Sequence, residues 1–457
     1  MKKWMSSALL MLLVLVLVSG CATSNGNNEG SKNSTGNSTG QSSSEKKNSD
    51  EKITLKVYTW YNLENEKFDL IKSEFEKVHP NIMIEYVSAG DNNSLEHLKK
   101  VDLAAASNES MDVIMFSNSA QYAQRLAQGL LEPLDEYMAA EGVNFADEYS
   151  VDTKAEGKYY GLPGKSVSFF VLINEEHLKK ANLPLPTEWT WDEFLDYAKA
   201  MTNISDEKKN YGTYFHTWPN PYLMLTNLNQ LKDAYLVTDD HKSANVDTDV
   251  MRKALEIRLQ AEADGSATPY AEVISQKMNY RPQYFNQDAS MIITGSFMLP
   301  EVGGTDKVPA TFKTVFAPIP KLTKEEPNRA EVASDIVTVY SKSKNKDAAY
   351  TFARWFTTEG LIVQGRNIPS WKKANMENVI DTIINATNNP EMIDKASALQ
   401  YFTTTEMLSR PLPVPYTTEV ETAIQDEFDL MMLKGQSIDE TIAKAQEKIQ
   451  KIVDQNQ

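Results

Sequence analysis

From residue 53 onward, the sequence predicts an α/β fold with a mostly parallel sheet. Short apolar segments alternate with longer segments that carry apolar residues at helical spacing. Strands that are joined by a helix run parallel to one another in such an alternation. Residues 112–116 (Asp-Val-Ile-Met-Phe) are almost continuously apolar, which is typical of a strand that is buried on both faces.

The first elements can be placed in order along the chain. Residues 53–60 alternate apolar and mixed side chains and predict a strand. Residues 63–77 predict a helix, because Phe68, Ile71 and Phe75 fall on one face, and Pro80 ends it. We then expect a strand over 82–87, a helix over 95–106, the strand at 112–116, and a helix over 120–128 that stops at Gly129.

Two capping boxes mark helix starts further along the chain. Thr190 is followed three residues later by Glu193, and Ser437 by Glu440, so each pair can satisfy the free amides of a helix start. The second helix is amphipathic and is expected to run to Val453. Because Trp191 opens the first of these helices, we assign it to the core.

Candidate ligand contacts follow two of the predicted strands. Ligands of parallel sheets gather beyond the carboxyl ends of the strands. Trp60, Tyr61 and Asn62 follow the first strand, and Ser117 and Asn118 follow the third. We expect these five side chains to contact a ligand.

The N-terminus predicts export and a lipid anchor. Lys2 and Lys3 precede an apolar run that is short for a membrane span, and small residues then lead to Cys21, the only cysteine. The sequence Val-Ser-Gly-Cys resembles the lipobox of bacterial lipoproteins. That resemblance implies a signal peptide over residues 1–20 and a diacylated Cys21 that holds the protein on the outer face of the cell membrane. Residues 22–50 are almost wholly small and polar, which predicts a disordered tether as on Gram-positive lipoproteins.

Composition narrows the remaining possibilities. Apolar residues make up 41% and charged residues 24% of the chain, as in ordinary globular proteins, and the length suggests two domains. The formal charge is −17, or −19 without Lys2 and Lys3, which argues against a nucleic acid partner. With Cys21 acylated, no thiol remains for catalysis or metal binding, and we expect neither a metal nor a cofactor.

Several blocks resemble family 1 extracellular solute-binding proteins, the receptors of ABC importers that include the maltose-binding type. The most specific is Gly157-Lys-Tyr-Tyr-Gly-Leu-Pro163, and the order and spacing of the blocks extend the resemblance over nearly everything after residue 52. The other blocks are residues 75–82, 111–116, 129–135, 171–174, 180–183, 189–194, 328–360 and the last twenty residues. Three positions depart from the family pattern: Ala333-Ser334-Asp335 replaces a glycine pair, Ile173-Asn174-Glu175 replaces Tyr-Asn-Lys, and Phe297 replaces a tryptophan.

The resemblance implies a type II periplasmic-binding fold of two lobes. Each lobe would have a mostly parallel sheet flanked by helices, and several crossing strands would form a hinge. Residues 51–164 and 338–366 would form the N-terminal lobe, and residues 165–337 and 367–457 the C-terminal lobe. The protein would be a monomer that binds a small solute, most often a sugar, and passes it to ABC permease subunits.

A sugar site needs flat aromatic side chains for C–H faces and polar groups for hydroxyls. The chain has 7 Trp and 20 Tyr, enough to furnish such a cleft. Besides the strand ends, we expect contacts near the hinge and in turn-like segments. These candidates are Lys165, Trp218, Phe297, Asp335, Trp371 and Arg410.

Two other classes of function stay open. An exported carbohydrate-active enzyme would need two carboxylates at a cleft, and an acidic chain has many candidates. However, His-Glu-x-x-His does not occur, and the five histidines show no ligand spacing. Gly-x-Ser-x-Gly occurs once, at residues 36–40, within the predicted disordered tether, where no strand and helix would hold the serine. A sensor or adhesin partner without transport would use the same closing receptor, so the sequence does not separate it from an importer subunit.

Overall fold

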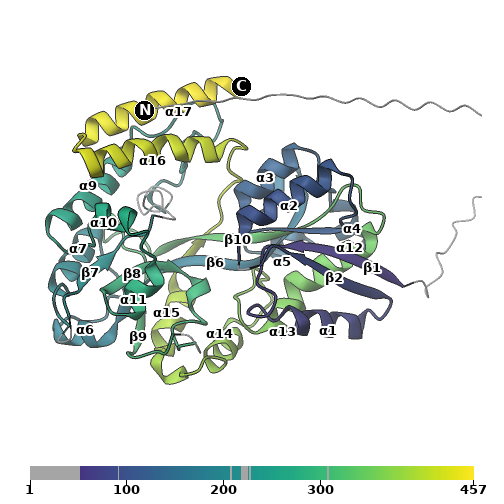
Figure 1. The fold of residues 1–457 in the computed structure, drawn as a ribbon, viewed down its shortest axis with the longest axis horizontal. Helices are drawn as coiled ribbons and strands as arrows, with labels where there is room; N and C mark the ends of the chain where they lie inside the picture. The colour runs from purple at the N-terminus through teal and green to yellow at the C-terminus, as the bar shows by residue number, and fades with distance from the viewer. Residues whose placement is uncertain (1–51, 91, 206–207, 218–224, 226–227, 306–307) are drawn as a thin grey trace, which may run out of the picture. The chain divides into compact units, whose positions relative to one another are not determined.

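The computed structural model describes residues 52–457, except residues 91, 206–207, 218–224, 226–227 and 306–307. The expected signal peptide, Cys21, the tether and Trp218 lie outside the described residues. The main sheet has the strand order β2-β1-β3-β10-β6-β8-β7, with β11 paired to β10 and β9 paired to β6 (Figure 1). A separate hairpin is formed by β4 and β5.

The first elements confirm the predicted alternation. Strand β1 pairs in parallel with β2 from Ile53 opposite Ile82 to Thr59 opposite Ser88, and it pairs in parallel with β3 on its other side. Helices α2 and α3 cover one face of these strands, and α1 and α13 cover the other (Figure 1). The bounds are β1 Ile53–Thr59, α1 Phe68–Val78, β2 Ile82–Ser88, α2 Ser94–Ala106, β3 Val113–Phe116, α3 Ser119–Ala127, α4 Asp135–Glu141, α5 Phe145–Glu148, β4 Lys154–Ala155 and β5 Lys158–Tyr159.

Helix α1 begins five residues later than the sequence predicts. Residues 63–67 form turns instead, and the Phe68 amide donates to the Leu63 carbonyl. Lys67 has a φ of 53°, in the left-handed region that helices do not continue through. This turn separates the residues that follow β1 from the helix.

Strands β6 and β10 are the longest in the sheet and lie at its centre. They run antiparallel to each other, and β10 is also antiparallel to β3. Leu162 and Val337 lie in the same core cluster as α1, whereas Phe170 and Ala330, near the other ends of the two strands, lie in a cluster with α14 and α15. The two strands therefore connect separate core clusters.

The remaining elements follow in chain order. Their bounds are β6 Gly161–Asn174, α6 Glu175–Lys180, α7 Trp191–Ala200, β7 Tyr211–Tyr214, α9 Asp249–Ala263, α10 Tyr270–Ser275, α11 Tyr280–Phe285, β8 Ala289–Gly295, β9 Thr314–Ala317, β10 Arg329–Val339, α12 Lys346–Trp355, α13 Leu361–Gln364, α14 Met376–Asn385, α15 Lys395–Thr404, β11 Glu406–Leu408, α16 Thr417–Lys434 and α17 Ile438–Gln455. Within the described part of the chain, none of these helices combines the length and the apolar character that crossing a bilayer requires.

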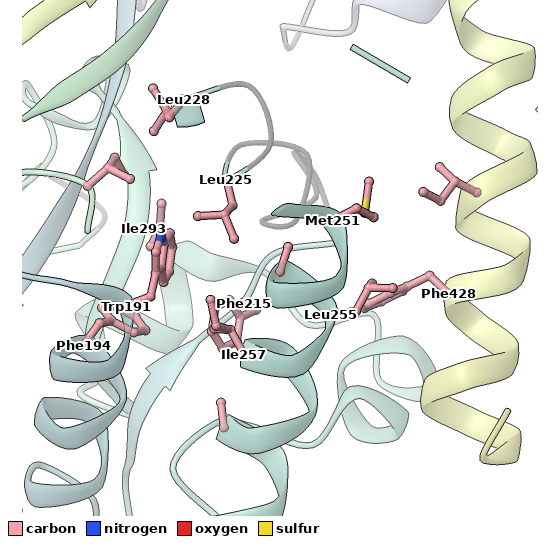
Figure 2. Packing of buried hydrophobic residues seen from close by; sticks show 14 of the residues in the cluster. Trp191, Phe194, Phe215, Leu225, Leu228, Met251, Leu255, Ile257, Ile293 and Phe428 are labelled. Atoms are coloured by element: carbon pink, nitrogen blue, oxygen red, sulfur yellow. The ribbon is translucent and has the colours of Figure 1, made fainter. Parts of the chain in front are cut away.

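The largest core cluster confirms the assignment of Trp191 to structure. Trp191 is 2% exposed and lies with Phe194, on the same helix, toward Phe215 and Ile293 (Figure 2). On the other side of α9, Leu255 points toward Phe428 of α16 (Figure 2). The cluster therefore joins α7, α9 and α16 into one layer.

One of the two predicted capping boxes is complete. The Thr190 side chain accepts from the Glu193 amide at 3.3 Å, and Glu193 accepts from the Thr190 amide at 2.8 Å. At α17, Ser437 accepts from the Glu440 amide, but the Glu440 carboxylate pairs with Lys444. An i,i+4 ion pair thus replaces the second half of the expected box.

Close packing of α7 on β7 gives a test of the fold. A Cβ at Gly212 would overlap the backbone carbonyl of Ala198, which cannot move without displacing α7. We expect Gly212→Ala to lower the free energy of unfolding by about 3 kcal/mol or more, measured by urea denaturation. Gly129→Ala is the control, because Gly129 has a φ of 71° but open space around it, and it should cost only about 1 kcal/mol. Equal losses would contradict this account of the packing.

Candidate functional site

Tyr61 and Asp335 meet where β1 ends against the central strands. The Tyr61 hydroxyl donates to Oδ2 of Asp335, and the Lys165 amide donates to Oδ1 at 2.6 Å. Tyr61 is 2% and Asp335 1% exposed. Three predicted ligand residues from distant parts of the sequence are thus joined by one buried carboxylate.

A β-bulge gives this carboxylate its space. The pairing of β10 with β6 shifts between Ser334 and Ile336, so Asp335 faces two residues of β6, Gly164 and Lys165. A Cβ on Gly164 would lie 2.7 Å from Oδ1 of Asp335. Bulges re-aim side chains, and here the bulge and the absence of a side chain at 164 admit the aspartate.

The Lys165 ammonium lies over two aromatic faces. Its Nζ is 4.5 Å from the ring centre of Tyr61 and 5.9 Å from that of Trp60, and these rings stack at 4.2 Å. No carboxylate of the described residues lies within ion-pair distance of this ammonium. Cation–π attraction therefore holds a half-buried positive charge beside the end of β1.

Burial is the largest influence on the pKa of Asp335 and of Tyr61. Burial raises the pKa of Asp335, while the Lys165 ammonium and the bonds from Tyr61 and the Lys165 amide act in the opposite direction. Burial also raises the pKa of Tyr61 well above its usual value, and the nearby Asp335 and Glu66 add to this. The phenol is therefore a permanent donor to the carboxyl group.

The polar residues after β1 and β3 make local hydrogen bonds. The Asn62 side chain accepts from the Asn65 amide at 2.9 Å. Asn118 caps α3 by accepting from the Gln121 amide, and Ser117 donates its hydroxyl to the Gln121 side chain. All three residues are partly exposed, so they keep surface for a ligand at the strand ends.

Aromatic rings gather at the ends of β7 and β8. Phe297 lies 6.3 Å from Tyr280 and 6.5 Å from Phe169, and Tyr280 lies 4.3 Å from His216, measured between ring centres. Gly295 permits this approach, because a Cβ there would come within 2.5 Å of the Phe297 ring. Of this group, only Phe297 is predicted from the sequence as a ligand contact.

His216 and Tyr280 were missed for different reasons. Burial lowers the pKa of His216 to about 4, so the ring is neutral, and its Nε2 has no hydrogen-bond partner within the described ranges. His216 lies two residues before Trp218, in the same turn-like segment of the sequence. That position is the signal from which His216 could have been predicted. Tyr280 follows the cap residue Asn279, but its approach to β8 depends on tertiary packing.

Trp371 is fixed by a buried acid. Its indole N–H donates to Glu148 at 2.7 Å, and Glu148 also pairs with Arg354 and Lys373. Burial alone would raise the pKa of Glu148, but the bonds from Lys373 and Trp371 and the charge of Arg354 lower it. The indole lines a hollow of ≈ 200 Å³ together with Asn367 and Asn378. Tyr61, Lys165 and Asp335 do not line this hollow, although Ser370, the residue before Trp371, contacts Ser334 beside Asp335.

Two guanidinium nitrogens of Arg410 have no acceptor among the described residues. Its Nε and Nη2 are buried and have no hydrogen-bond partner in the described part of the chain. Pro411 and Leu412, which follow it, line a hollow of ≈ 110 Å³ together with Tyr235 and Glu421. Among the described residues, no group of three or more His, Cys, Asp or Glu side chains could hold a metal ion.

The sequence matches one family model over most of its length. The model describes the bacterial extracellular solute-binding proteins and matches residues 61–361, more than half of the chain. The chain belongs to this family. The resemblance predicted from the hinge and helix blocks is therefore confirmed.

Relatives of this solute-binding protein include sugar receptors. It is 21% identical over 316 residues to the maltotriose-binding protein of Pyrococcus abyssi. The aligned region covers 68% of this chain and 64% of that protein, so the chain spans less than two thirds of this relative. A Listeria monocytogenes ABC substrate-binding protein, solved in complex with cycloalternan, has a TM-score of 0.73 at 17% identity, over 88% of this chain and 100% of the other. The GacH receptor of Streptomyces glaucescens, solved unliganded and with acarbose, has a TM-score of 0.68 at 20% identity, over 88% and 99%. These structures confirm the predicted fold class, the two-lobe periplasmic-binding fold.

The buried carboxyl group predicts a specific pH dependence for this solute-binding protein. Because the folded-state pKa of Asp335 is raised, the folded state binds this proton more tightly than the unfolded chain. The stability of the wild type relative to Asp335→Asn should therefore be greatest below the unfolded pKa of about 4, and should fall as pH rises through the folded pKa. Urea unfolding of both proteins from pH 4 to pH 7 measures this difference. A difference that is constant or grows with pH would contradict the assignment.

Proposed function

We propose that this protein binds a sugar or oligosaccharide between two lobes and delivers it unchanged to an ABC permease. The observation that carries the proposal is that Tyr61 and Lys165 meet at Asp335, with Trp60 stacked on Tyr61. Rings, an ammonium and a carboxylate are the groups that complement the faces and hydroxyls of a sugar. The sugar ligands named for the related receptors support the same ligand class.

We propose the lobes at the boundaries predicted above, residues 51–164 with 338–366 and residues 165–337 with 367–457. Strands β6 and β10 run between core clusters, which supports their role as hinge strands. The segment after Asn367 also crosses, because Ser166 donates to the Ile368 carbonyl and Ser370 to the Gly164 carbonyl. A ligand that contacts both lobes only in the closed state would shift the equilibrium toward that state.

The proposed ligand contacts are the residues selected from the sequence. Trp60, Tyr61, Asn62, Ser117 and Asn118 would act from one lobe. Lys165, Asp335 and Phe297 would act from the hinge and the other lobe, and Tyr280 extends the Phe297 surface. Trp218, Trp371 and Arg410 stay predictions of the same kind.

We expect saccharides to stabilise and compact the protein. A thermal-shift screen of mono- and oligosaccharides should yield a stabilising ligand, because a ligand of the native state adds about 2.7 kcal/mol at a hundredfold excess over Kd. Small-angle scattering with that ligand should show a smaller radius of gyration. Tight binding without compaction would contradict closure of the lobes around the ligand. Release of a cleaved sugar would favour the alternative that the protein is an enzyme.

Two phenylalanines provide a matched control for that screen. Phe297 and Phe402 are both partly buried and pack against the same cluster, but only Phe297 follows the end of β8. Phe297→Leu should weaken the saccharide about two- to tenfold, and Phe402→Leu should leave its Kd unchanged.

We also propose that Cys21 is diacylated and holds the protein on the outer face of the membrane, as a monomer on its tether. Two acyl chains suffice for stable anchoring, since each buried methylene contributes about 0.8 kcal/mol. Cys21→Ala should release the protein from the membrane fraction of a Gram-positive host into the medium, as followed by immunoblotting. Retention of the variant in the membrane fraction would contradict the anchor without affecting the proposed ligand.

A further inference from the structure

We infer that the ligand carries an oxyanion, a carboxylate or a phosphate ester, and that Arg410 binds it. This inference rests on the proposed function, since it names the charge of the saccharide that the same site would take. Nε and Nη2 of Arg410 are buried without an acceptor among the described residues. A guanidinium stays charged in proteins, and burying a charge without a partner is unfavourable. A ligand is the partner that would remove this cost.

The strand register places Arg410 between the two halves of the sheet. Strand β11 pairs with β10 as far as Leu408 opposite Glu331, and β3 pairs with the same strand from Phe116 opposite Ile336. Leu412 packs against the cluster that contains Phe116 and Ile336. Residues 409–411 therefore pass along the stretch of β10 that lies between β11 and β3.

Contacts of the neighbouring residues agree with this placement. The Asp152 amide donates to the Ser409 hydroxyl at 3.0 Å, and the Tyr235 hydroxyl donates to the Pro411 carbonyl at 3.3 Å. Pro411, the residue after Arg410, lines a hollow of ≈ 110 Å³. Arg410 thus directly precedes a cavity-lining segment and lies near the strand end that carries Ser117.

Two acids, Glu331 and Glu421, lie near Tyr235 together with Arg410, but neither forms an ion pair with it in the described part of the chain. Asp335 already accepts from Tyr61 and the Lys165 amide, and no ion pair within 4.0 Å joins Arg410 to an acid of the described residues. Lys165, across β10, is a second cation without an ion-pair partner there. Two unpaired cations flank β10 between residues 332 and 335.

The free edge of the guanidinium indicates the shape of the group. Nε and Nη2 point their N–H groups in parallel, which matches the two oxygens of a carboxylate or phosphate. A uronate or a sugar phosphate supplies such a pair, and a neutral sugar supplies only hydroxyls. We therefore expect acidic saccharides to be preferred over their neutral parents.

The test measures binding of glucose, glucuronate and glucose 6-phosphate, and of a neutral trisaccharide and its uronate-terminated counterpart, by calorimetry on the full chain. We expect at least one acidic saccharide to bind about tenfold or more tightly than its neutral parent, as a charged bidentate contact allows. Glucuronate and glucose 6-phosphate separate the two possible sources of the oxyanion.

Three variants distinguish a specific contact with Arg410 from a general effect of positive charge on binding of the acid. Arg410→Gln should abolish the preference for the acid, and Arg410→Lys should keep a reduced preference because it keeps the charge but loses the fork. Arg329→Gln is the matched control, because Arg329 lies on β10 but is paired with Glu406 at 3.0 Å, and it should keep the preference. Circular dichroism and unfolding confirm that each variant is folded.

The remaining outcomes distinguish failure of the oxyanion inference from failure of the proposed saccharide function. Neutral saccharides that bind as tightly as the acidic ones, or an Arg410→Gln variant that keeps the preference, would overturn this inference and leave the proposed function intact. If no saccharide of either kind binds, the proposed saccharide function falls together with it.

Discussion

The buried carboxylate of Asp335 is the interaction on which the arrangement of the candidate site depends. It joins the loop after β1 to both central strands, through the Tyr61 hydroxyl and the Lys165 amide. A buried charge is tolerated only where donors surround it, so Tyr61 is held in one position. Trp60 then stacks on Tyr61, and the Lys165 ammonium lies over both rings.

Two other buried acids, Glu66 and Glu148, hold residues 366–373. Glu66 accepts from Asn367 at 2.9 Å and pairs with Arg366, and Glu148 binds Trp371 and Lys373. Each of the proposed crossings of the chain is thus tied to a carboxylate that is almost inaccessible to water. Part of the acidity of this chain is therefore structural and lies where the proposed lobes would move.

The aromatic residues divide into two groups with different surroundings. Trp189 and Trp191 lie in the large core cluster, where they join α7 to the sheet. Phe297 follows β8 and packs beside Tyr280, the first residue of α11, and both are partly exposed. Trp60 follows β1 near the Lys165 ammonium but is 5% exposed and belongs to the core cluster of α1.

The sequence by itself determined the family, the alternation of β1 to α3 and the core position of Trp191. These features follow from local periodicity, capping residues and the order of short blocks, which need no knowledge of distant contacts. The tertiary structure alone decided that Asp335 faces Tyr61, that Trp371 binds Glu148, and that Tyr280 and His216 approach Phe297. These contacts join residues up to 274 positions apart, and they depend on a β-bulge and on strand register that no local pattern encodes.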